Sequence, residues 1–260
     1  MGNIETKIKL NLIQDKNKAQ DLLRIAEKQD FYLEECADSK SNSIARQDLT
    51  YSANSISLLD ANSFQTFINN VRLPQKLQLE LGEINIVHLM PTADGGMPHT
   101  RPNMICYPNL SFSESTLIHE LWHNHQRNFY SYWEQIFKLL GWTLWNGTLP
   151  TKFEENRRYN PDTIDCPLWI FKDTWVPIPI FKDIMAPTMN MVSIWFYNPT
   201  KGYHLTRIPE EVSSYFSNLD EVAFEHPREI TAYMLAEPKK FESSPAFKDL
   251  MQAIGHTAIR

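Results

Sequence analysis

Apolar residues at helical spacing begin near the N-terminus of the chain. From residue 5 to about 36, Leu, Ile and Ala form a stripe opposite charged residues, which predicts an outer helix covering the core. Residues 37–57 are rich in Ser, Asn and Ala, a composition typical of a loop. A short helix is expected next, with Asp60 as its N-cap and Pro74 beyond its end.

The apolar spacing changes to every second residue after position 76. Leu, Ile and Val recur in this way through residues 77–89, which predicts strands. Asp94 and the two glycines after it predict a turn, and residues 104–107 predict a short strand that Pro108 stops. We expect this last strand to form one wall of a cleft, with a free edge that can hold an extended peptide by backbone pairing.

A central helix is expected to begin near Ser113. Ser111 and Glu114 have the spacing of a capping box, and apolar residues continue at helical spacing as far as Gly141. This helix carries the clearest chemical motif of the chain.

Residues 142–200 combine many prolines with most of the tryptophans. The prolines exclude long helices in this segment. Two interpretations are open: an aromatic insertion that lines a substrate pocket over the cleft, and an irregular buried core. A lipid-facing patch is a third, weaker interpretation. The tryptophans concerned are Trp142, Trp145, Trp169, Trp175 and Trp195.

Helical spacing returns in the last quarter of the chain. It predicts a helix from Pro209, a second helix from Pro227 to the residue before Pro238, and a last helix near residues 244–254. Pro227 suits the first turn of a helix, because the backbone N–H that proline lacks has no helical partner there.

The sequence His119-Glu120-Leu121-Trp122-His123 in the central helix matches the pattern H-E-x-x-H. Residues i and i+4 lie on one face of a helix, so His119 and His123 can share a metal ion. Glu120 points along the same groove, where it can serve as a general base. His125 faces elsewhere and is not counted as a ligand.

Two histidines do not complete a catalytic zinc site, which takes three protein ligands and keeps one position for water. The chain has no third His at the short H-E-x-x-H-x-x-G-x-x-H spacing, so a carboxylate from a second helix is required. Glu229 is the preferred candidate, because Ala232 on the same helical face would allow a close approach. Glu225 and Glu221 remain alternatives.

The two motifs together resemble those of the gluzincin metallopeptidases. In that group H-E-x-x-H on one helix is completed by a Glu on a later helix, often written E-x-x-A followed by an acidic residue. This chain has Glu229-Ile230-Thr231-Ala232-Tyr233, so Tyr233 replaces the acidic residue and would support a ligand by hydrogen bonding. The resemblance is confined to the two motif segments and assigns no family within the group.

The resemblance implies a zincin-like α+β fold. We expect a small mixed or antiparallel sheet beside the H-E-x-x-H helix, a second ligand-bearing helix, and outer helices at both ends. A chain of 260 residues fits one domain. Its expected parts are a helical N-terminal part at 1–75, the sheet and metal-binding helix at 76–140, the aromatic and proline-rich insertion at 141–205, and the C-terminal helices with the third ligand at 206–260.

The resemblance also implies a zinc-dependent peptidase acting on a peptide or protein substrate. His119, His123 and Glu229 would bind Zn²⁺, while Glu120 would take a proton from water and deliver it to the leaving amine. A non-catalytic zincin-like scaffold with a structural zinc is the alternative from another class. A chance match on an ordinary core helix is the third hypothesis.

A peptidase also needs a hydrogen-bond donor for the oxyanion that develops on the scissile carbonyl. His204 and Tyr203 are the first candidates, and Tyr233 and Tyr215 follow. The sequence does not choose among these four.

The net charge of −6 and the lack of a basic, aromatic-rich run argue against a nucleic-acid partner. The three cysteines, an odd number spaced far apart, favour a reducing compartment over a disulfide framework.

Neither a signal-peptide core nor an apolar run of transmembrane length occurs in the sequence. A soluble cytoplasmic protein is therefore expected, with delivery to another compartment or a host left open. Residues 1–6 match the N-myristoylation pattern at Gly2, although chance matches to so short a pattern favour an unmodified Gly2.

Overall fold

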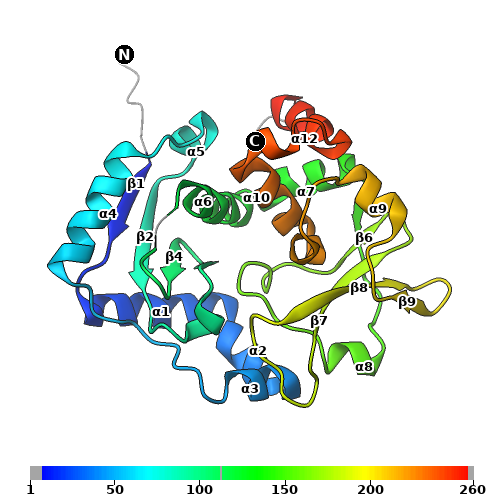
Figure 1. Cartoon of the computed structure of the whole chain (residues 1–260), viewed down its shortest axis with the longest axis horizontal. Helices are drawn as coiled ribbons and strands as arrows, with labels where there is room; N and C mark the ends of the chain where they lie inside the picture. The colour runs from blue at the N-terminus through cyan, green and yellow to red at the C-terminus, as the bar shows by residue number, and fades with distance from the viewer. Residues whose placement is uncertain (1–7, 112, 257–260) are drawn as a thin grey trace.

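The computed structural model describes residues 8–111 and 113–256, and it combines helices with three small sheets (Figure 1). This confirms the α+β class. The first sheet lies in the N-terminal half of the chain, and the other two lie beyond residue 141. The helices α6 and α10 pack against each other between these two halves.

The first sheet is mixed, with strand order β1-β2-β4-β3. Strands β1, β2 and β4 are parallel, and β3 runs antiparallel to β4. The prediction of a helix from residue 5 was therefore wrong for β1, whose Leu10 pairs with Ile84 of β2. The strands are β1 (Lys9–Leu12), β2 (Glu83–His88), β3 (His99–Arg101) and β4 (Met104–Tyr107).

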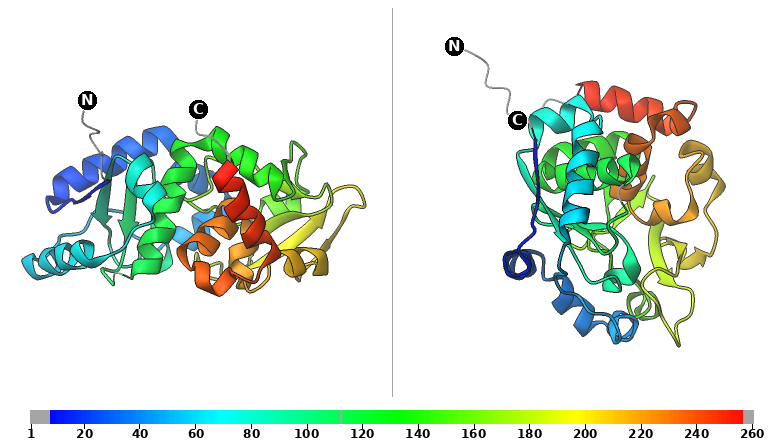
Figure 2. Two further views of the ribbon diagram at one scale, coloured as in Figure 1. Left: turned by 90° about the horizontal axis from the view of Figure 1, so that it is seen from above. Right: turned by 60° about the vertical axis from the view of Figure 1, so that its left-hand side comes forward.

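Helices cover both faces of this sheet (Figure 2). Along β2, Ile84 and Ile86 face a core that includes residues of α4 and α6, whereas Val87 faces the apolar residues of α1. Alternate strand residues point to opposite faces, so the adjacent Ile86 and Val87 are buried on opposite sides of the sheet, as a doubly covered sheet requires. The helices before β2 are α1 (Lys16–Asp30), α2 (Tyr32–Asp38), α3 (Lys40–Arg46), α4 (Leu58–Asn70) and α5 (Gln75–Glu80).

Three of these helices correct the sequence predictions. Helix α3 lies in the predicted loop, where Asn42 is fully buried and donates a hydrogen bond to the backbone of Arg157 at 2.8 Å. Helix α4 is capped by Ser57, whose side chain accepts from the Asp60 N–H, so Asp60 is not the cap.

Helix α5 occupies the start of the segment predicted as strands. Leu77 and Leu81 are buried, while Leu79 between them is 48% exposed. Burial at i and i+4 with exposure at i+2 is the helical pattern, which the three leucines alone do not distinguish from a strand.

The central helix, α6 (Glu114–Asn128), begins where it was predicted but with a different cap. The Ser113 hydroxyl accepts from the Thr116 N–H at 3.1 Å, so Ser113 is the N-cap and Ser111 is not. The helix ends at Phe129, whose non-helical φ of −123° and ψ of 47° separate it from α7 (Tyr130–Leu139). The predicted continuous helix to Gly141 is therefore two helices.

Residues 142–205 form two further sheets, β5-β6 and β7-β8-β9, with one four-residue helix. The absence of a long helix from this fully described segment confirms the proline-based prediction. Trp142, Trp169 and Trp175 are at most 5% exposed, so they belong to a buried core. The elements are β5 (Trp142–Leu144), α8 (Thr151–Glu154), β6 (Trp169–Phe171), β7 (Val176–Phe181), β8 (Val192–Asn198) and β9 (Tyr203–Leu205).

The C-terminal part is helical, as predicted. Pro227 occupies the first turn of α10, which ends before Pro238. Beyond β9 the chain forms α9 (Glu210–Tyr215), the 3₁₀ helix η2 (Glu221–Glu225), α10 (Pro227–Ala236), α11 (Pro238–Phe241) and α12 (Pro245–His256).

One buried apolar cluster joins the two halves of the molecule. It includes Ile86 of β2, Leu121 of α6, Ile230 of α10 and Phe196 of β8. Helices α6 and α10 therefore pack into the same core, and this packing fixes the positions of their other, non-core faces relative to each other.

No helix of the described residues is long and apolar enough to cross a membrane. Gly2 lies outside the described residues.

The cap of α10 makes the stability of the protein depend on pH. His226 Nδ1 accepts from the Arg228 N–H at 3.0 Å, and its Nε2 donates to the Pro167 carbonyl at 3.3 Å. Both bonds require the neutral ring with its proton on Nε2. Burial, and then the Arg228 guanidinium, lower the pKa of His226 to about 3.

We expect His226 to destabilise the fold as the pH falls. Because the unfolded ring has an ordinary pKa near 6.5, the unfolded state binds more protons between about pH 3 and 6.5, and stability rises with pH there by up to ~1.4 kcal/mol per unit. Asn can cap a helix without titrating, so His226→Asn should lose this contribution.

Urea unfolding of both proteins from pH 4 to 8 measures the effect. The difference in free energy of unfolding between wild type and His226→Asn should rise up to about pH 6.5 and stay constant above about pH 7.5. A difference that is independent of pH throughout would refute this role.

Candidate metal centre

Helix α6 brings two imidazole rings together over one turn. His123 is fully buried and the His119 side chain is 13% exposed. Their Nε2 atoms lie 2.9 Å apart, and the rings meet edge to face. Two imidazole nitrogens approach this closely only with a proton or another cation to share.

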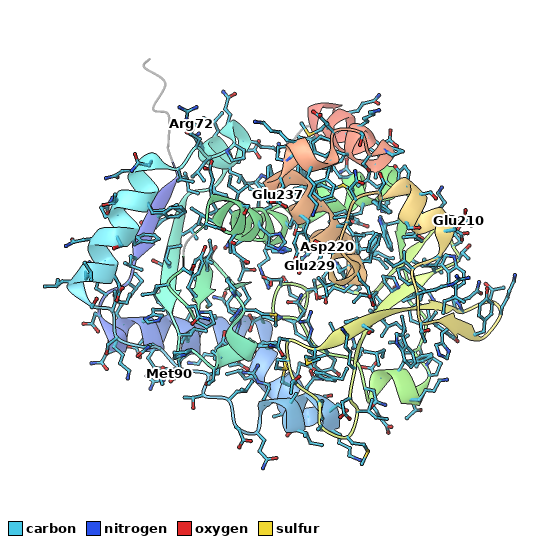
Figure 3. All side chains as sticks on the ribbon, in the orientation of Figure 1. Arg72, Met90, Glu210, Asp220, Glu229 and Glu237 are labelled. Atoms are coloured by element: carbon cyan, nitrogen blue, oxygen red, sulfur yellow. The ribbon has the colours of Figure 1, made fainter. Side chains whose placement is uncertain are left out.

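Helix α10 contributes the third group. Glu229 Oε2 lies 3.3 Å from His119 Nε2 and 3.4 Å from His123 Nε2. Figure 3 shows Glu229 near the centre of the molecule, on the helix that packs against α6. Ala232, one turn further along α10, is fully buried, in keeping with the close approach expected of a small side chain. The structure thus brings together His119, His123 and Glu229, the three ligands predicted from the sequence.

The three ligand atoms fit a tetrahedral metal ion. Ligands at about 2.0–2.1 Å around a tetrahedral centre lie about 3.3–3.4 Å from one another. The separations in the triad are 2.9, 3.3 and 3.4 Å. Two imidazoles and one carboxylate also form a donor set that leaves a fourth position open, which is typical of catalytic zinc.

Rival carboxylates have other partners. Glu225 accepts hydrogen bonds from Arg158 and Asn160, and Glu221 Oε1 accepts from the Ile194 N–H at 3.3 Å. His125 contacts Glu80 and accepts from Trp133 Nε1, facing away from the triad as predicted. None of the three is available as the third ligand.

Electrostatics in the triad favour a bound cation. Burial raises the pKa of Glu229, but the nearby His123 and His119 outweigh burial and hold it well below its usual range. Burial lowers the pKa of His123, but the Glu229 carboxylate outweighs that effect and raises it to about 9. The carboxylate therefore stays ionised and attracts positive charge to the imidazole nitrogens.

Gln126 fixes the orientation of His123. Its Nε2 donates to the Arg228 carbonyl and to Thr231 Oγ1, each at 3.0 Å, so its Oε1 must face His123 Nδ1 at 2.9 Å. That oxygen accepts from Nδ1–H, so Nε2 is the nitrogen that faces the triad and can bind a metal ion in place of a proton. Gln126 was not predicted from the sequence, although its i+3 spacing from His123 was a usable signal.

His119 is supported differently. Its Nδ1 is buried and has no hydrogen-bond partner among the described residues, and the Tyr233 ring packs edge-on against it at 4.4 Å between centroids. Packing with an aromatic ring therefore takes the place of a polar contact at this ligand.

Glu120 lies beside the triad, and one of its two carboxylate oxygens has no hydrogen-bond donor among the described residues. It is 3% exposed, and its Oε2 is buried with no hydrogen-bond partner in the described structure. Burial, and then the Asp162 carboxylate, raise its pKa well above the usual range. A buried carboxylate oxygen without a donor is costly, and such sites are often functional.

A cavity of about 460 Å³ opens onto these groups. Its lining includes His119, Glu120, Glu229 and Tyr233. Other segments also contribute to the wall, among them residues 97–99 at the start of β3, residues 158–162 between α8 and β6, and residues 189–190 before β8. The candidate metal triad is therefore accessible from this cavity through His119 and Glu229.

The edge of the first sheet does not match the prediction. Strand β4 lies inside the sheet, and β3 is the edge strand. Asp162 Oδ1 accepts from the Thr100 N–H and from the Thr100 hydroxyl, both at 2.6 Å, and Arg127 Nη2 lies 3.5 Å from the Thr100 carbonyl. Side chains therefore occupy the outer edge at Thr100, where a paired peptide was expected.

The four candidate oxyanion donors differ in whether they line this cavity. Tyr233 lines the cavity, and burial followed by the Glu229 and Glu120 carboxylates raises its pKa, so its hydroxyl stays protonated and able to donate. His204 on β9 does not line this cavity and stacks on Trp195 at 4.8 Å between centroids.

The other two tyrosines also lie elsewhere. Tyr203 on β9 packs against Trp175, and Tyr215 donates to Asp249 at 2.7 Å. The structure therefore brings only Tyr233 to the metal triad.

Comparisons of the chain with protein-family models, with curated proteins and with solved structures found no match.

Replacing Glu229 with Gln should abolish stoichiometric zinc binding. The amide keeps the shape of the side chain but removes the charge that offsets a divalent ion beside two buried imidazoles. Zinc content after dialysis, measured by mass spectrometry, tests this expectation. Glu237→Gln is the matched control, because Glu237 lines the same cavity at the exposed end of α10. A Glu229→Gln protein that keeps stoichiometric zinc would exclude Glu229 as a ligand.

Proposed function

We propose that the protein is a zinc-dependent peptidase of the gluzincin type, with a zincin-like arrangement of its two central helices. The observation that carries the proposal is the triad of His119, His123 and Glu229 beside the buried Glu120, whose Oε2 has no hydrogen-bond partner among the described residues. His119, Glu229 and Glu120 line one cavity. A structural metal site is closed by protein ligands and needs neither a cavity nor a general base.

His119, His123 and Glu229 would hold the metal, and Gln126 would keep His123 in the tautomer that binds it. When bound, zinc supplies a Lewis acid that polarises a carbonyl and lowers the pKa of water. The peptide bond would lie in the cavity, within reach of Glu120.

Glu120 would act as the proton shuttle. It would accept a proton from the water that attacks the scissile carbonyl and deliver this proton to the leaving amine nitrogen. Its pKa is raised by burial and by Asp162, and a carboxylate brought closer to the working pH can both take and give a proton.

Tyr233 would donate a hydrogen bond to the oxyanion. It lines the cavity and lies close enough to Glu229 and Glu120 for their charges to raise its pKa. His204 is not proposed for this role, because it packs against Phe153 and Trp195 away from the cavity.

The substrate proposed is a peptide or protein segment that enters the cavity. Its backbone would not add to β3 at Thr100, since Asp162 occupies that edge. Polar groups of the loop at 158–162 and of α10 would contact the segment instead.

Glu120→Gln should abolish peptide cleavage while zinc remains bound. The amide cannot accept the proton, and a lost general base lowers kcat by roughly 10²–10⁴-fold. A degenerate peptide library analysed by mass spectrometry, together with zinc content, measures both quantities. Zinc in both proteins without any Glu120-dependent cleavage would instead favour the non-catalytic scaffold.

Tyr233→Phe should lower kcat with little change in KM. Loss of one oxyanion donor costs about 10²–10³-fold in kcat, while the ring that packs on His119 is kept. The control is Tyr215→Phe, which removes a hydroxyl bound to the exposed Asp249 and should leave kcat unchanged. Equal kcat for Tyr233→Phe and wild type would remove Tyr233 from the mechanism.

A further inference from the structure

The loop between α8 and β6 places an amide beside the third ligand. Asn160 Nδ2 donates to Glu229 Oε1 at 3.0 Å, and the same nitrogen donates to Glu225 Oε1. The other oxygen of Glu229, Oε2, is the one that faces the two imidazoles. Asn160 therefore holds the carboxylate oxygen that the metal does not need.

The orientation of this amide is determined by its surroundings. Asn160 Oδ1 accepts from the Asp162 N–H at 2.9 Å, which is an Asx turn within the loop. A flipped amide would present its oxygen to two carboxylates and its amino group to an N–H donor. Only the orientation described satisfies all three contacts, because the amino group has two hydrogens to donate.

The second carboxylate is itself held in place. Arg158 donates to Glu225 and also to the Met189 carbonyl at 3.2 Å. Arg158 and Glu225 are both more than 90% buried, so each charge requires the other. Glu225 thus gives Asn160 a second, fixed acceptor besides Glu229.

We infer that Asn160 is a positioning residue for the metal site, which orients Glu229 so that Oε2 alone faces His119 and His123. It acts through Glu229 and reaches the metal only by way of that ligand. The inference rests on the proposed zinc site but not on peptidase activity. An unheld carboxylate can rotate and must be ordered when metal binds, so loss of such a supporting hydrogen bond typically weakens metal affinity about 10–100-fold.

Two variants distinguish the hydrogen bond that Asn160 donates to Glu229 from the one that it accepts in the loop turn. Asn160→Asp keeps an oxygen that can accept from the Asp162 N–H but replaces the donating amino group, whereas Asn160→Ala removes the acceptor and the donor together. Both should bind zinc about 10–100-fold more weakly than wild type. Affinity is measured by competition with a chromogenic chelator of known zinc affinity.

Co²⁺ provides a readout of geometry. The visible d–d absorption of the Co²⁺-loaded protein should shift in both variants, because the Glu229 carboxylate is no longer held in one orientation. Asn190→Ala is the matched control, since Asn190 lines the same cavity from the loop before β8. It should retain the wild-type zinc affinity and Co²⁺ spectrum.

Each outcome decides one point. Wild-type affinity and spectrum in Asn160→Asp, with losses only in Asn160→Ala, would overturn the inference and assign Asn160 to the loop turn alone. A lower melting temperature of the metal-free variants with unchanged zinc affinity would overturn it as well. Failure of wild-type protein to bind zinc would refute the proposed function, while zinc binding without peptide cleavage would leave the inference standing. If Asn160→Ala does not fold, the chelator competition with Asn160→Asp decides.

Discussion

The burial of a carboxylate between two imidazoles is the interaction on which the rest of the structure depends. Glu229 and His123 come from helices about a hundred residues apart, and both are nearly or fully withdrawn from solvent. An ionised carboxylate in such a place is stable only if positive charge and hydrogen bonds surround it. The fold must therefore hold α6 and α10 so that Glu229 Oε2 stays within 3.4 Å of both imidazole Nε2 atoms.

Two kinds of contact provide this register. Apolar packing fixes the coarse relation of the helices, because Leu121 of α6 and Ile230 of α10 belong to one buried cluster. Polar contacts then fix the side chains: Gln126 of α6 donates to the Arg228 carbonyl and to Thr231 of α10. The same Gln126 orients His123, so a single side chain both joins the helices and sets a ligand tautomer.

Local chemistry made the three residues of the candidate metal site predictable from the sequence. His119 and His123 share a face because of helical periodicity, and Pro227 starts the second helix because it lacks an N–H. Glu229 followed from the need for a third ligand and from the small Ala232 beside it.

What the sequence did not predict depends on contacts between distant segments. Strand β1 forms because Leu10 pairs with Ile84. The apolar residues near the N-terminus also fit helical spacing, so the sequence pattern alone did not indicate this pairing. His204 was a reasonable donor by type, but tertiary packing places it on Trp195. Asn160 had no local signal at all, since its role arises only where its loop meets α10.

The supports of the ligands are neutral, and this affects the proposed base. Gln126 supports His123, and Asn160 supports Glu229. The neutral ring of Tyr233, at the position that is acidic in the motif this helix resembles, packs on His119. Asp162 is already the largest charge that raises the pKa of Glu120. Further carboxylates among the supports would raise that pKa more, since like charges disfavour ionisation. Amide and phenol supports orient the ligands without adding this charge, and so leave Glu120 better able to ionise and accept a proton.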